Sequence, residues 1–574
     1  MTRYVFDIET DGLLEEATKL HCIVAADMNA RKIKKFSTEA DNIDEGLKLL
    51  AEAEELIGHN IMEYDVQVIK KLYPNWNTSA KLTDTLILSR LIWGNMGEVD
   101  AEKFKFLPPP VRGRHSLEAW GYRLKFQKGL YGETTDWKTY TPEMLEYCVQ
   151  DVRVNIKLYE HILKKNYSQD AIQLEHEIHR ICLEQQALGF PFNEEKAASL
   201  YATLSARRDE IKAQLIDTFE PTIIELKSKT KTIPFNPASR QQIADRLMKR
   251  GWEPKDFTAS GQAVVNESTL KEISDIPEAK LLVEYLMLIK RVGQLAEGKN
   301  GWLKLSKNGR IHYRTNTLGA VTGRATASNP NVQQVPSDRA EYGKECRELF
   351  YAPKGWELLG SDQSGIELRC LASYMSEWDG GDYGKVILDG DIHTANQLAA
   401  GLETRSQAKT FIYGWLYGAG SAKIGSIVGK GAKEGTRLKN KFLEGLPALA
   451  SLQERVQKQA KKEGRVTGLD GRFIPVRHQH ACLNSLLQSC GAILAKRWVV
   501  IFHELCKKEG YVHGEDFQQV AWVHDEIQVL VKEGTGDIFG KLAVKAMGLT
   551  GEYYNFGVRL DAEYGIGKSW ADTH

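Results

Sequence analysis

The strongest constraint in the sequence is a pair of acids inside an apolar run. Residues 521–532 read AWVHDEIQVLVK, and the β-branched and aromatic residues of this run predict a buried strand. Asp525 and Glu526 lie side by side in the middle of it. Burying a carboxylate without a partner costs so much free energy that the group takes up a proton or binds a cation. The fold therefore has to bring a positive charge to these acids.

A second apolar run raises the same question. The segment LLGSDQSGIELRCLA predicts a strand that ends at Asp362 and continues into a helix carrying Glu367 and Arg369. Two such strands side by side would place Asp362 and Asp525 across one pair of metal ions. The cations would then make the buried negative charge tolerable.

A further set of acids lies near the amino terminus. Asp7 and Glu9 in VFDIET alternate along a predicted strand, so both point to one face. HNIMEYD supplies Asp65, and YCVQD supplies Tyr147 and Asp151 one helical turn apart. Mg²⁺ prefers oxygen ligands, and such a cluster would hold two ions about 3.5–4 Å apart to activate a water against a phosphodiester. Taken alone, the Asp-x-Glu pair also fits a solvated strand end.

Another acid of this segment has a structural interpretation. Asp84 directly precedes the apolar, helix-like run in LTDTLILSR. An acid at this place accepts hydrogen bonds from the first N–H groups of a helix. We therefore predict that Asp84 is an N-cap.

A basic and aromatic stripe occupies the segment TRSQAKTFIYGWLYGAG. Arg405, Lys409, Tyr413 and Tyr417 recur every four residues and so share one helical face. Such a stripe could belong to a core, but Arg and Lys are almost never fully buried unless they are paired. We predict that the basic turn meets phosphates and that the aromatic turn stacks on a base and its sugar. From Arg405 to Lys441 there are eight basic residues against a single acid, which favours a nucleic-acid partner.

Composition limits the remaining possibilities. At about 150 residues per domain, 574 residues predict three or four domains. Lys plus Arg equals Asp plus Glu at 76 each, so any basic surface is local. Eight cysteines without a C-x-x-C pair favour reduced thiols over disulfides or a zinc site. A signal peptide and a membrane-spanning run are not expected, which predicts a soluble intracellular protein without a membrane partner.

These motifs resemble known families. Asp7, Glu9, Asp65, Tyr147 and Asp151 resemble the three motifs of the DEDDy 3′–5′ exonucleases that proofread for DNA polymerases. The C-terminal half resembles family A DNA polymerases, because its two acid-bearing runs and the stripe segment resemble motifs A, B and C of that family. The resemblance extends to four further segments: TGRATASNPNVQQVP, GDIHTANQ, GLDGRFIPVR and LNSLLQSCGA. Within that family, the likeness is strongest to the replicative branch of T-seven-like phages.

The resemblance implies an α/β and α+β multidomain fold. A ribonuclease H-like DEDDy exonuclease domain at residues 1–165 would be followed by a right-hand polymerase domain. The thumb would span 170–300, the palm 301–384 and 506–574, and the fingers 385–505. The implied activity is template-directed DNA synthesis by two-metal-ion nucleotidyl transfer, with 3′–5′ exonuclease proofreading.

The resemblance also implies roles for individual residues. In the exonuclease, the four acids would ligate two Mg²⁺ ions and Tyr147 would orient the attacking water. In the polymerase, two Mg²⁺ ions would be held by Asp362, Asp525 and the backbone carbonyl of Gln363, with Glu526 in support; Mn²⁺ could substitute. Nucleotide binding is implied for Arg405, Lys409 and His393 at the triphosphate, Tyr413 at the sugar and base, Tyr417 towards the template, and Glu367 against a 2′-hydroxyl. DNA contacts are implied for Arg324, Arg472, Gln488 and His524.

The implied partners are primer–template DNA and dNTPs, with phage helicase–primase and single-stranded-DNA-binding protein as candidates. A monomer in the cytoplasm of an infected bacterial cell is expected. T-seven-like polymerases carry a long thumb insertion that captures host thioredoxin. Here only EPTIIELKSKTKTIP separates LIDTF from FNPASRQQIADRL, which predicts an ordinary long loop and no thioredoxin partner.

Other functions remain open at this point. A single-subunit RNA polymerase shares the right-hand plan, but Glu367 and the exonuclease motifs count against it. A bacterial repair polymerase would carry a separate 5′ nuclease domain, which is not expected here. A non-catalytic DNA-binding or processivity protein would have lost acids, and the sequence retains all of them.

Overall fold

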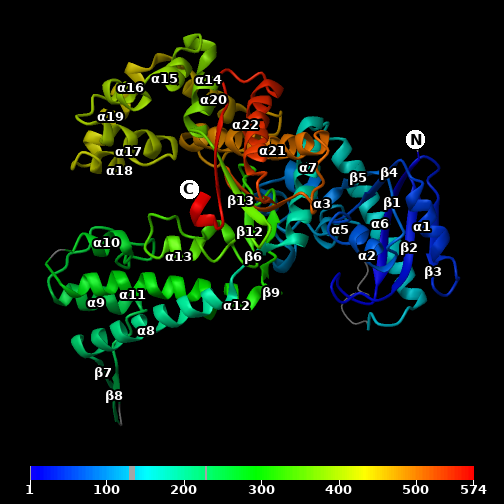
Figure 1. Cartoon of the computed structure of the whole chain (residues 1–574), viewed down its shortest axis with the longest axis horizontal. Helices are drawn as coiled ribbons and strands as arrows, with labels where there is room; N and C mark the ends of the chain where they lie inside the picture. Colours follow the sequence, from blue (N-terminus) through cyan, green and yellow to red (C-terminus); the bar gives the residue numbers. More distant parts are fainter. Residues whose placement is uncertain (1, 128–135, 227–228, 274, 574) are drawn as a thin grey trace. The chain divides into compact units, whose positions relative to one another are not determined.

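The computed structural model describes residues 2–127, 136–226, 229–273 and 275–573 (Figure 1). The chain divides into two compact units. The first comprises Met1–Ala187, Thr315–Thr326 and Leu359–Gly565; the second comprises Leu188–Arg314, Ala327–Leu358 and Ile566–His574. The predicted borders of exonuclease, thumb, palm and fingers divide the chain differently, and they stay a prediction.

The amino-terminal part of the first unit is an α/β structure around a five-stranded sheet. The strand order is β3-β2-β1-β4-β5, with β1–β2 and β2–β3 antiparallel and β1–β4 and β4–β5 parallel. The strands are β1 (Arg3–Thr10), β2 (Leu20–Asp27), β3 (Ile33–Ser37), β4 (Glu55–Gly58) and β5 (Lys81–Asp84). The helices are α1 (Ile43–Ala51), α2 (Asp65–Leu72), α3 (Thr85–Ile92), α4 (Met96–Lys103), α5 (Leu117–Arg123) and α6 (Pro142–Leu163).

Alternate residues of β1 pack into two separate hydrophobic cores. Phe6 and Ile8 belong to a buried cluster that includes residues of α1 and α2. Val5 belongs to a second cluster, which includes residues of α6. Because side chains of a strand alternate between its faces, the odd-numbered Asp7 and Glu9 share the face of Val5, towards α6. The predicted common face of these two acids is confirmed.

A second sheet of four strands has the order β16-β17-β13-β18. The strands are β13 (Trp356–Gln363), β16 (Phe517–Val523), β17 (Glu526–Lys532) and β18 (Ala562–Gly567). The prediction of one strand over residues 521–532 is wrong, because the run folds back on itself as an antiparallel hairpin with Val523 opposite Glu526. His524 and Asp525 form its two-residue turn. The apolar residues on both sides of the acids explain why the pattern resembles a single strand.

Helices complete the first unit. They are α7 (Gln169–Leu188), α14 (Ile366–Asp379), α15 (Asp382–Asp389), α16 (Ile392–Ala400), α17 (Arg405–Leu416), α18 (Ser421–Ser426), α19 (Ala432–Gly445), α20 (Pro447–Glu463), α21 (Cys482–Lys508) and α22 (Gly536–Tyr553). Short strands β11 (Arg314–Asn316), β12 (Thr326–Ser328), β14 (Arg465–Thr467) and β15 (Phe473–Pro475) pair as two ribbons.

The longest of these helices, α21, is a core element. Contrary to the sequence-based expectation, the stretch Gln479–Lys508 is long and apolar enough to cross a membrane. However, 78% of its most apolar segment is buried inside the protein. A helix that is apolar on every side fits such a position at the centre of a large core.

A buried group of four charges connects α7, α21 and the β14–β15 ribbon. Lys496 Nζ lies 2.5 Å from Glu175 Oε1, and Arg472 Nη1 lies 2.8 Å from the same oxygen. Arg472 Nη2 also lies 2.6 Å from Asp470 Oδ2. Burial lowers the pKa of Lys496 to about 8, which the nearby Glu175 carboxylate opposes. Two carboxylates therefore balance two cations out of contact with water.

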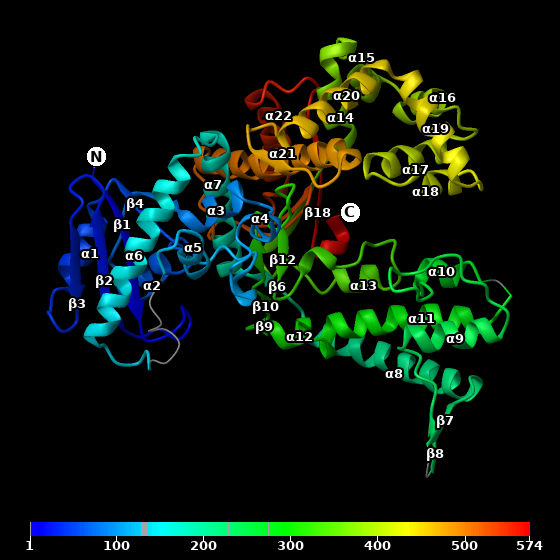
Figure 2. The same cartoon turned by 180° about the vertical axis from the view of Figure 1, so that it is seen from behind.

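The second unit is mainly helical. Its helices are α8 (Glu194–Thr218), α9 (Arg240–Lys249), α10 (Glu267–Lys271), α11 (Glu278–Val292), α12 (Trp302–Leu305) and α13 (Gly343–Arg347). Helices α8 and α11 run side by side in both views (Figures 1 and 2). A small sheet has the order β6-β10-β9, from Phe190–Pro191, Arg310–Ile311 and Ser306–Lys307.

The segment after α8 differs from its prediction. It forms an antiparallel hairpin of β7 (Thr222–Leu226) and β8 (Lys229–Ile233), where an ordinary loop was expected. β-Branched residues dominate both strands, and Thr222–Leu226 and Lys229–Ile233 pair along their whole length. Lys227 and Ser228 lie outside the described residues.

The buried charge group predicts a large and partner-dependent stability effect. Glu175→Gln should lower the free energy of unfolding by about 3–5 kcal/mol, because it leaves two buried cations with too little negative charge. Lys496→Met in the same chain should recover part of this loss. Urea unfolding of the single and double variants measures the coupling. Lys508→Met, at an exposed lysine of the same helix, is the control. A loss below about 1 kcal/mol for Glu175→Gln would contradict this interpretation.

Candidate active sites

One acid cluster lies between β1 and α6. Ligand atoms of Asp7, Glu9 and Cys148 all lie within 4.8 Å of one another. The Cys148 thiol donates to Asp7 Oδ2 at 3.8 Å. Burial raises the pKa of this thiol, and contact with Cys22 and the charges of Asp7 and Glu9 raise it further. The cluster thus concentrates negative charge at one place on the sheet.

Asp65 joins this cluster from the first turn of α2. Strand β4 pairs with β1 only as far as Val5, so the Ile8 N–H is left to donate to the Asp65 carboxylate. Asp65 is only 3% exposed, and its Oδ1 atom has no hydrogen-bond partner. Burial raises the pKa of Asp65 to about 7, and the negative charge of Asp84 adds to the shift. A cation at this place would satisfy the orphaned oxygen.

Helix α6 supplies the remaining residues predicted for this site. Tyr147 is half-buried, with its ring 6.0 Å from that of Trp137, and Asp151 follows one turn later with 3% exposure. Helix α6 packs against both β1 and β2.

Asp84 has the structural role predicted for it. Its carboxylate accepts a hydrogen bond from the Leu86 N–H at 2.9 Å as the N-cap of α3, so the prediction of an N-cap is confirmed.

The donors of this cluster fit divalent cations. Carboxylate oxygens are the ligands that hard cations prefer, and several gather here. The buried Oδ1 of Asp65 is the observation that most directly requires a positive partner. Asp7, Glu9, Asp65 and Asp151 could hold such ions. The thiol of Cys148 was missed from the sequence, although it directly follows Tyr147 in the motif EYCVQD.

The second acid cluster forms where β13 ends beside the β16–β17 turn. Strands β13 and β17 are neighbours in the sheet, and the Gln363 N–H donates to the backbone oxygen of Asp525 at 3.0 Å. This bond brings Asp362 and Asp525 to the same place, which confirms the predicted pairing of the two acid-bearing strands. Asp362 is exposed and Asp525 is half-buried, so their carboxylates remain accessible.

The tight turn determines where these acids point. His524 adopts a left-handed backbone conformation (φ 60°), which is uncommon outside glycine, and the Trp522 indole donates to its backbone oxygen. Glu526 is 8% exposed and accepts from the Gln528 amide at 2.7 Å, so it sits beneath the turn. Burial raises the pKa of Asp525 to about 6, and the charges of Glu367 and Glu526 contribute. A cation would relieve this repulsion.

The conformation of the chain after Asp362 depends on a glycine. Gly365 precedes α14 with φ 56°, a backbone conformation that L side chains rarely adopt. The chain therefore turns sharply from β13 into α14. Glu367 lies in the first turn of that helix and faces the acid cluster closely enough to shift the pKa of Asp525.

Helix α17 presents the predicted basic and aromatic stripe to solvent. Arg405, Lys409 and Tyr417 are exposed and Tyr413 is half-buried, while Ala408, Phe411 and Ile412 pack into the core. A capping box of Thr404 and Gln407 starts the helix. The stripe is therefore a surface, as predicted, and not a core face.

Two contacts tie this stripe to its surroundings. Arg405 Nε lies 2.7 Å from Asp391 Oδ2, and Asp391 also caps α16, the helix that begins next to His393. Sequence reasoning missed Asp391, although an Asp directly before IHTANQ is a typical N-cap. At the other end, the Tyr417 hydroxyl donates to Glu367 Oε1 at 2.8 Å. Tyr417 thus meets the residue predicted to exclude a 2′-hydroxyl.

The predicted DNA-contact residues divide into two kinds. Arg324 and His524 lie at the acid cluster. The positive charge of Arg324 opposes part of the rise in the pKa of Asp525, and its side chain also lies within hydrogen-bonding reach of Tyr417. Gln488 is half-buried on α21. Arg472 contradicts its prediction, because it is 2% exposed and both ends of its guanidinium pair with buried carboxylates. We therefore assign Arg472 to the buried charge group.

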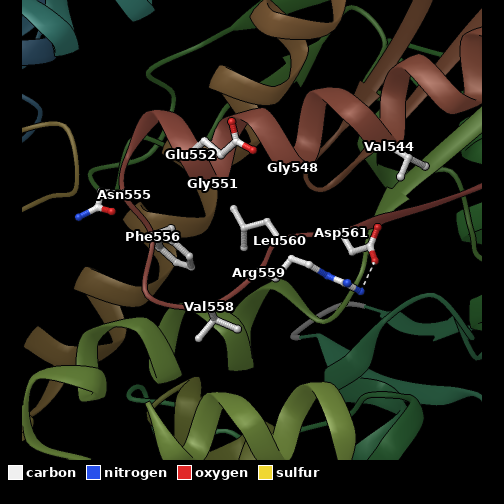
Figure 3. Close-up of a pocket in the computed structure, with 10 residues that line it drawn as sticks. All are labelled: Val544, Gly548, Gly551, Glu552, Asn555, Phe556, Val558, Arg559, Leu560 and Asp561. Atoms are coloured by element: carbon white, nitrogen blue, oxygen red, sulfur yellow. Dashed lines mark hydrogen bonds and ion pairs between the residues drawn. The ribbon is translucent and has the colours of Figure 1, made fainter. Parts of the chain in front are cut away.

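A separate pocket of about 540 Å³ lies between the end of α22 and the segment leading to β18 (Figure 3). Arg559 and Asp561, two residues apart on that segment, pair with each other at 3.3 Å. The backbone oxygen of Asp561 accepts from the Ser364 N–H, which places the pocket beside the acid-bearing strand without including its acids. It contains none of the predicted site residues.

Two protein-family models match the chain: DNA polymerase family A over residues 202–572 and the RNase H superfamily over residues 4–163. The DNA-directed DNA polymerase of Escherichia phage T7 is 36% identical over 702 aligned residues, which cover 99% of this chain and 100% of the relative. That of Enterobacteria phage T3 is also 36% identical, with the same coverage.

More distant proteins share the fold. DNA polymerase I of Pseudomonas aeruginosa is 28% identical over 59% of this chain and 39% of its own length. A solved structure, the polymerase domain of Pol1 from M. smegmatis with DNA primer–template and dNTP, superposes with a TM-score of 0.77 at 18% identity, covering 99% and 96% of the two chains. These findings confirm the predicted fold class. The chain belongs to DNA polymerase family A and is a DNA-directed DNA polymerase with an RNase H-like, exonuclease-type domain.

Proposed function

We propose that the chain is the replicative DNA polymerase of a phage, which extends primers by two-metal-ion transfer and proofreads them with its 3′–5′ exonuclease. The observation that supports the polymerase chemistry most directly is the bond from Gln363 N–H to the Asp525 backbone. It joins two acid-bearing chain segments whose carboxylates stay open to solvent.

In the polymerase site, Asp362, Asp525 and the backbone carbonyl of Gln363 would hold two Mg²⁺ ions, for which Mn²⁺ could substitute. When bound, these ions supply charge stabilisation for the attacking and leaving oxygens of the transfer. Arg405 and Lys409 orient the triphosphate from the exposed end of α17, with His393 beside them. Tyr413 contacts the sugar and base. Positioning and charge do most of the work in such reactions.

In the exonuclease site, Asp7, Glu9, Asp65 and Asp151 would hold the cations and Tyr147 would orient a water. Asp65 supports this assignment through its buried, unpartnered oxygen and its raised pKa. Because the two acid clusters are built from different strands and helices, each can act without the other. Removing one set of acids should leave the second reaction intact.

Sugar selection distinguishes this function from that of an RNA polymerase. The Tyr417 hydroxyl fixes the Glu367 carboxylate at 2.8 Å, which restrains the side chain assigned to exclude a 2′-hydroxyl. Arg324, Gln488 and His524 would contact the primer–template. The acceptor atoms of the minor groove are similar in all base pairs, so contacts to them would not depend on the base sequence.

The phage relatives also suggest the cellular setting. Two phage polymerases match the whole chain, so we place this enzyme in the cytoplasm of an infected bacterium. A phage helicase–primase and a single-stranded-DNA-binding protein are the candidate partners, and we expect a monomer.

The independence of the two sites is testable by paired substitutions. Asp7→Ala with Glu9→Ala should lower 3′ degradation by about 10³-fold, equivalent to about 4 kcal/mol of transition-state stabilisation, and leave extension unchanged. Asp525→Ala should have the opposite effect. Glu45→Ala, at an exposed acid of α1, is the control. Loss of both activities from either change, with DNA binding retained, would argue against two independent centres.

The contact between Tyr417 and Glu367 predicts a change in sugar discrimination. Glu367→Ala should increase ribonucleotide incorporation relative to deoxynucleotide by about 10- to 200-fold, since it opens space for one hydroxyl. Tyr417→Phe should produce a smaller increase, because Glu367 loses its hydrogen bond. Single-nucleotide insertion kinetics measure the ratio. Tyr201→Phe removes a similar tyrosine–glutamate bond elsewhere and should change nothing. Efficient ribonucleotide use by the wild type would favour an RNA polymerase.

The short hairpin after α8 predicts that thioredoxin has no effect. The T7 relative aligns over 702 positions, so at least 128 of them lack a counterpart in this 574-residue chain. Strands of five residues offer little room for a separate partner-binding module. Primer extension with a DNA trap, with and without thioredoxin across a salt series, should give equal product lengths at each salt concentration. Clearly longer products with thioredoxin would refute the prediction.

A further inference from the structure

The acid cluster between β1 and α6 contains a sulfur atom that oxygen-preferring cations do not need. Among the residues that the structure describes, two groups of three side chains could hold a metal ion. One consists of Asp7, Glu9 and Cys148, and it alone contains a thiol. The family role proposed above uses only carboxylates and Tyr147, so it leaves Cys148 without a function.

The other group, Glu184, His503 and His513, is poorly suited to a cation. The Gln519 backbone N–H donates to His513 Nε2 at 3.1 Å, so this nitrogen already uses its lone pair. The second nitrogen of His513 then carries the proton, and it faces Glu184 at 3.1 Å. Both ring nitrogens of neutral His513 are therefore used in these contacts and are not available to a metal ion. Glu184 and His503 alone are too few ligands to hold one.

The geometry at Cys148 is that of neighbouring ligands on one ion. With metal–sulfur and metal–oxygen distances of about 2.3 and 2.1 Å, a tetrahedral ion separates the two ligand atoms by about 3.6 Å. The Sγ of Cys148 lies 3.8 Å from Asp7 Oδ2, and Glu9 is within the same 4.8 Å group. Only a small shift would bring all three atoms onto one cation.

The surroundings favour a cation bound from the solvent side. Asp7 and Glu9 are partly exposed, whereas Cys148 is fully buried behind them. Asp65 contributes an unpartnered buried oxygen next to Ile8, between the positions of Asp7 and Glu9 on β1. An ion could therefore enter past the carboxylates and meet the sulfur at the inner end of the site.

We propose that Cys148 makes this cluster a site for a thiophilic divalent cation, of the class of Cd²⁺ and Zn²⁺, ligated by its sulfur together with Asp7 and Glu9. Soft thiolate ligands select such ions, whereas carboxylates alone suit Mg²⁺ and Mn²⁺. Binding releases the thiol proton to solvent, so the ion meets three negative ligands. The inference rests on the proposed exonuclease role of the cluster, which the bound soft ion would block by occupying Asp7 and Glu9.

The polymerase site of the same chain acts as an internal comparison. The residues assigned there to metal ligation, Asp362, Asp525 and Gln363, offer oxygen only. A low concentration of Cd²⁺ in the presence of Mg²⁺ should therefore slow 3′ degradation at least about tenfold, while primer extension is nearly unchanged.

The direct test is a Cd²⁺ titration of the full chain in buffer without Mg²⁺, followed by ultraviolet absorption. Sulfur-to-cadmium charge transfer reports thiolate ligation, which binding to carboxylates or histidines does not produce. Wild type should saturate near one Cd²⁺ per chain. Cys148→Ser should lose the band and need at least about tenfold more Cd²⁺ to inhibit degradation. Cys346→Ser, at another buried cysteine, should behave as wild type.

The outcomes separate the two proposals. Absence of the band in wild type, or its persistence in Cys148→Ser, would overturn the thiophilic site even if degradation proceeds normally with Mg²⁺. Failure of wild type to degrade a 3′ end with Mg²⁺ alone would instead overturn the exonuclease role. Cys148→Ala provides a second variant if Cys148→Ser folds poorly, and retained primer extension verifies the fold in either case.

Discussion

The pairing of Glu175 with Lys496 and Arg472 fixes the centre of the first unit. These residues come from α7, α21 and the β14–β15 ribbon, and each is essentially removed from water. Charges of this kind tolerate burial only when each has its partner, so the pairing also fixes the register of the three elements. Helix α7 directly follows the RNase H-like segment, and α21 carries Gln488. The charge group therefore anchors the elements that position much of the remaining chemistry.

The two acid clusters follow the opposite principle. At the β1–α6 cluster and at the β16–β17 turn, burial raises the pKa values of Asp65 and Asp525, and the negative charges of nearby acids (Asp84 for Asp65, Glu367 and Glu526 for Asp525) add to the shifts. At the buried charge group each carboxylate pairs with a cation of the chain, whereas Asp65 and Asp525 keep raised pKa values in the protein alone. Such destabilised groups are typical of functional sites, where a ligand supplies the missing charge. Stability and chemistry are thus assigned to different carboxylates of one chain.

Local patterns in the sequence predicted most of these residues, because their signals depend on short-range geometry. The alternation of Asp7 and Glu9, the cap at Asp84 and the stripe on α17 follow from strand and helix periodicity alone. The hairpin at His524 was missed, since apolar residues on both sides of a two-residue turn resemble one strand. Arg472 was assigned to DNA because its partner Glu175 is distant in sequence, and no local pattern shows that Arg472 and the neighbouring Asp470 are buried together. Cys148 escaped notice for the same reason, as its contact with Asp7 spans 141 positions.

The ion pair of Arg405 with Asp391 affects how strongly salt should influence nucleotide capture. Because this guanidinium already has an anionic partner, a phosphate that reaches it exchanges one pair for another. The number of ion pairs is then conserved, and the free energy gained is only the difference between the energy of the ion pair with the phosphate and that of the ion pair with Asp391. Screening by salt weakens both pairs alike, so it largely cancels in that difference. Lys409, one turn along α17, has no such pair among the contacts described and should carry more of the ionic-strength dependence.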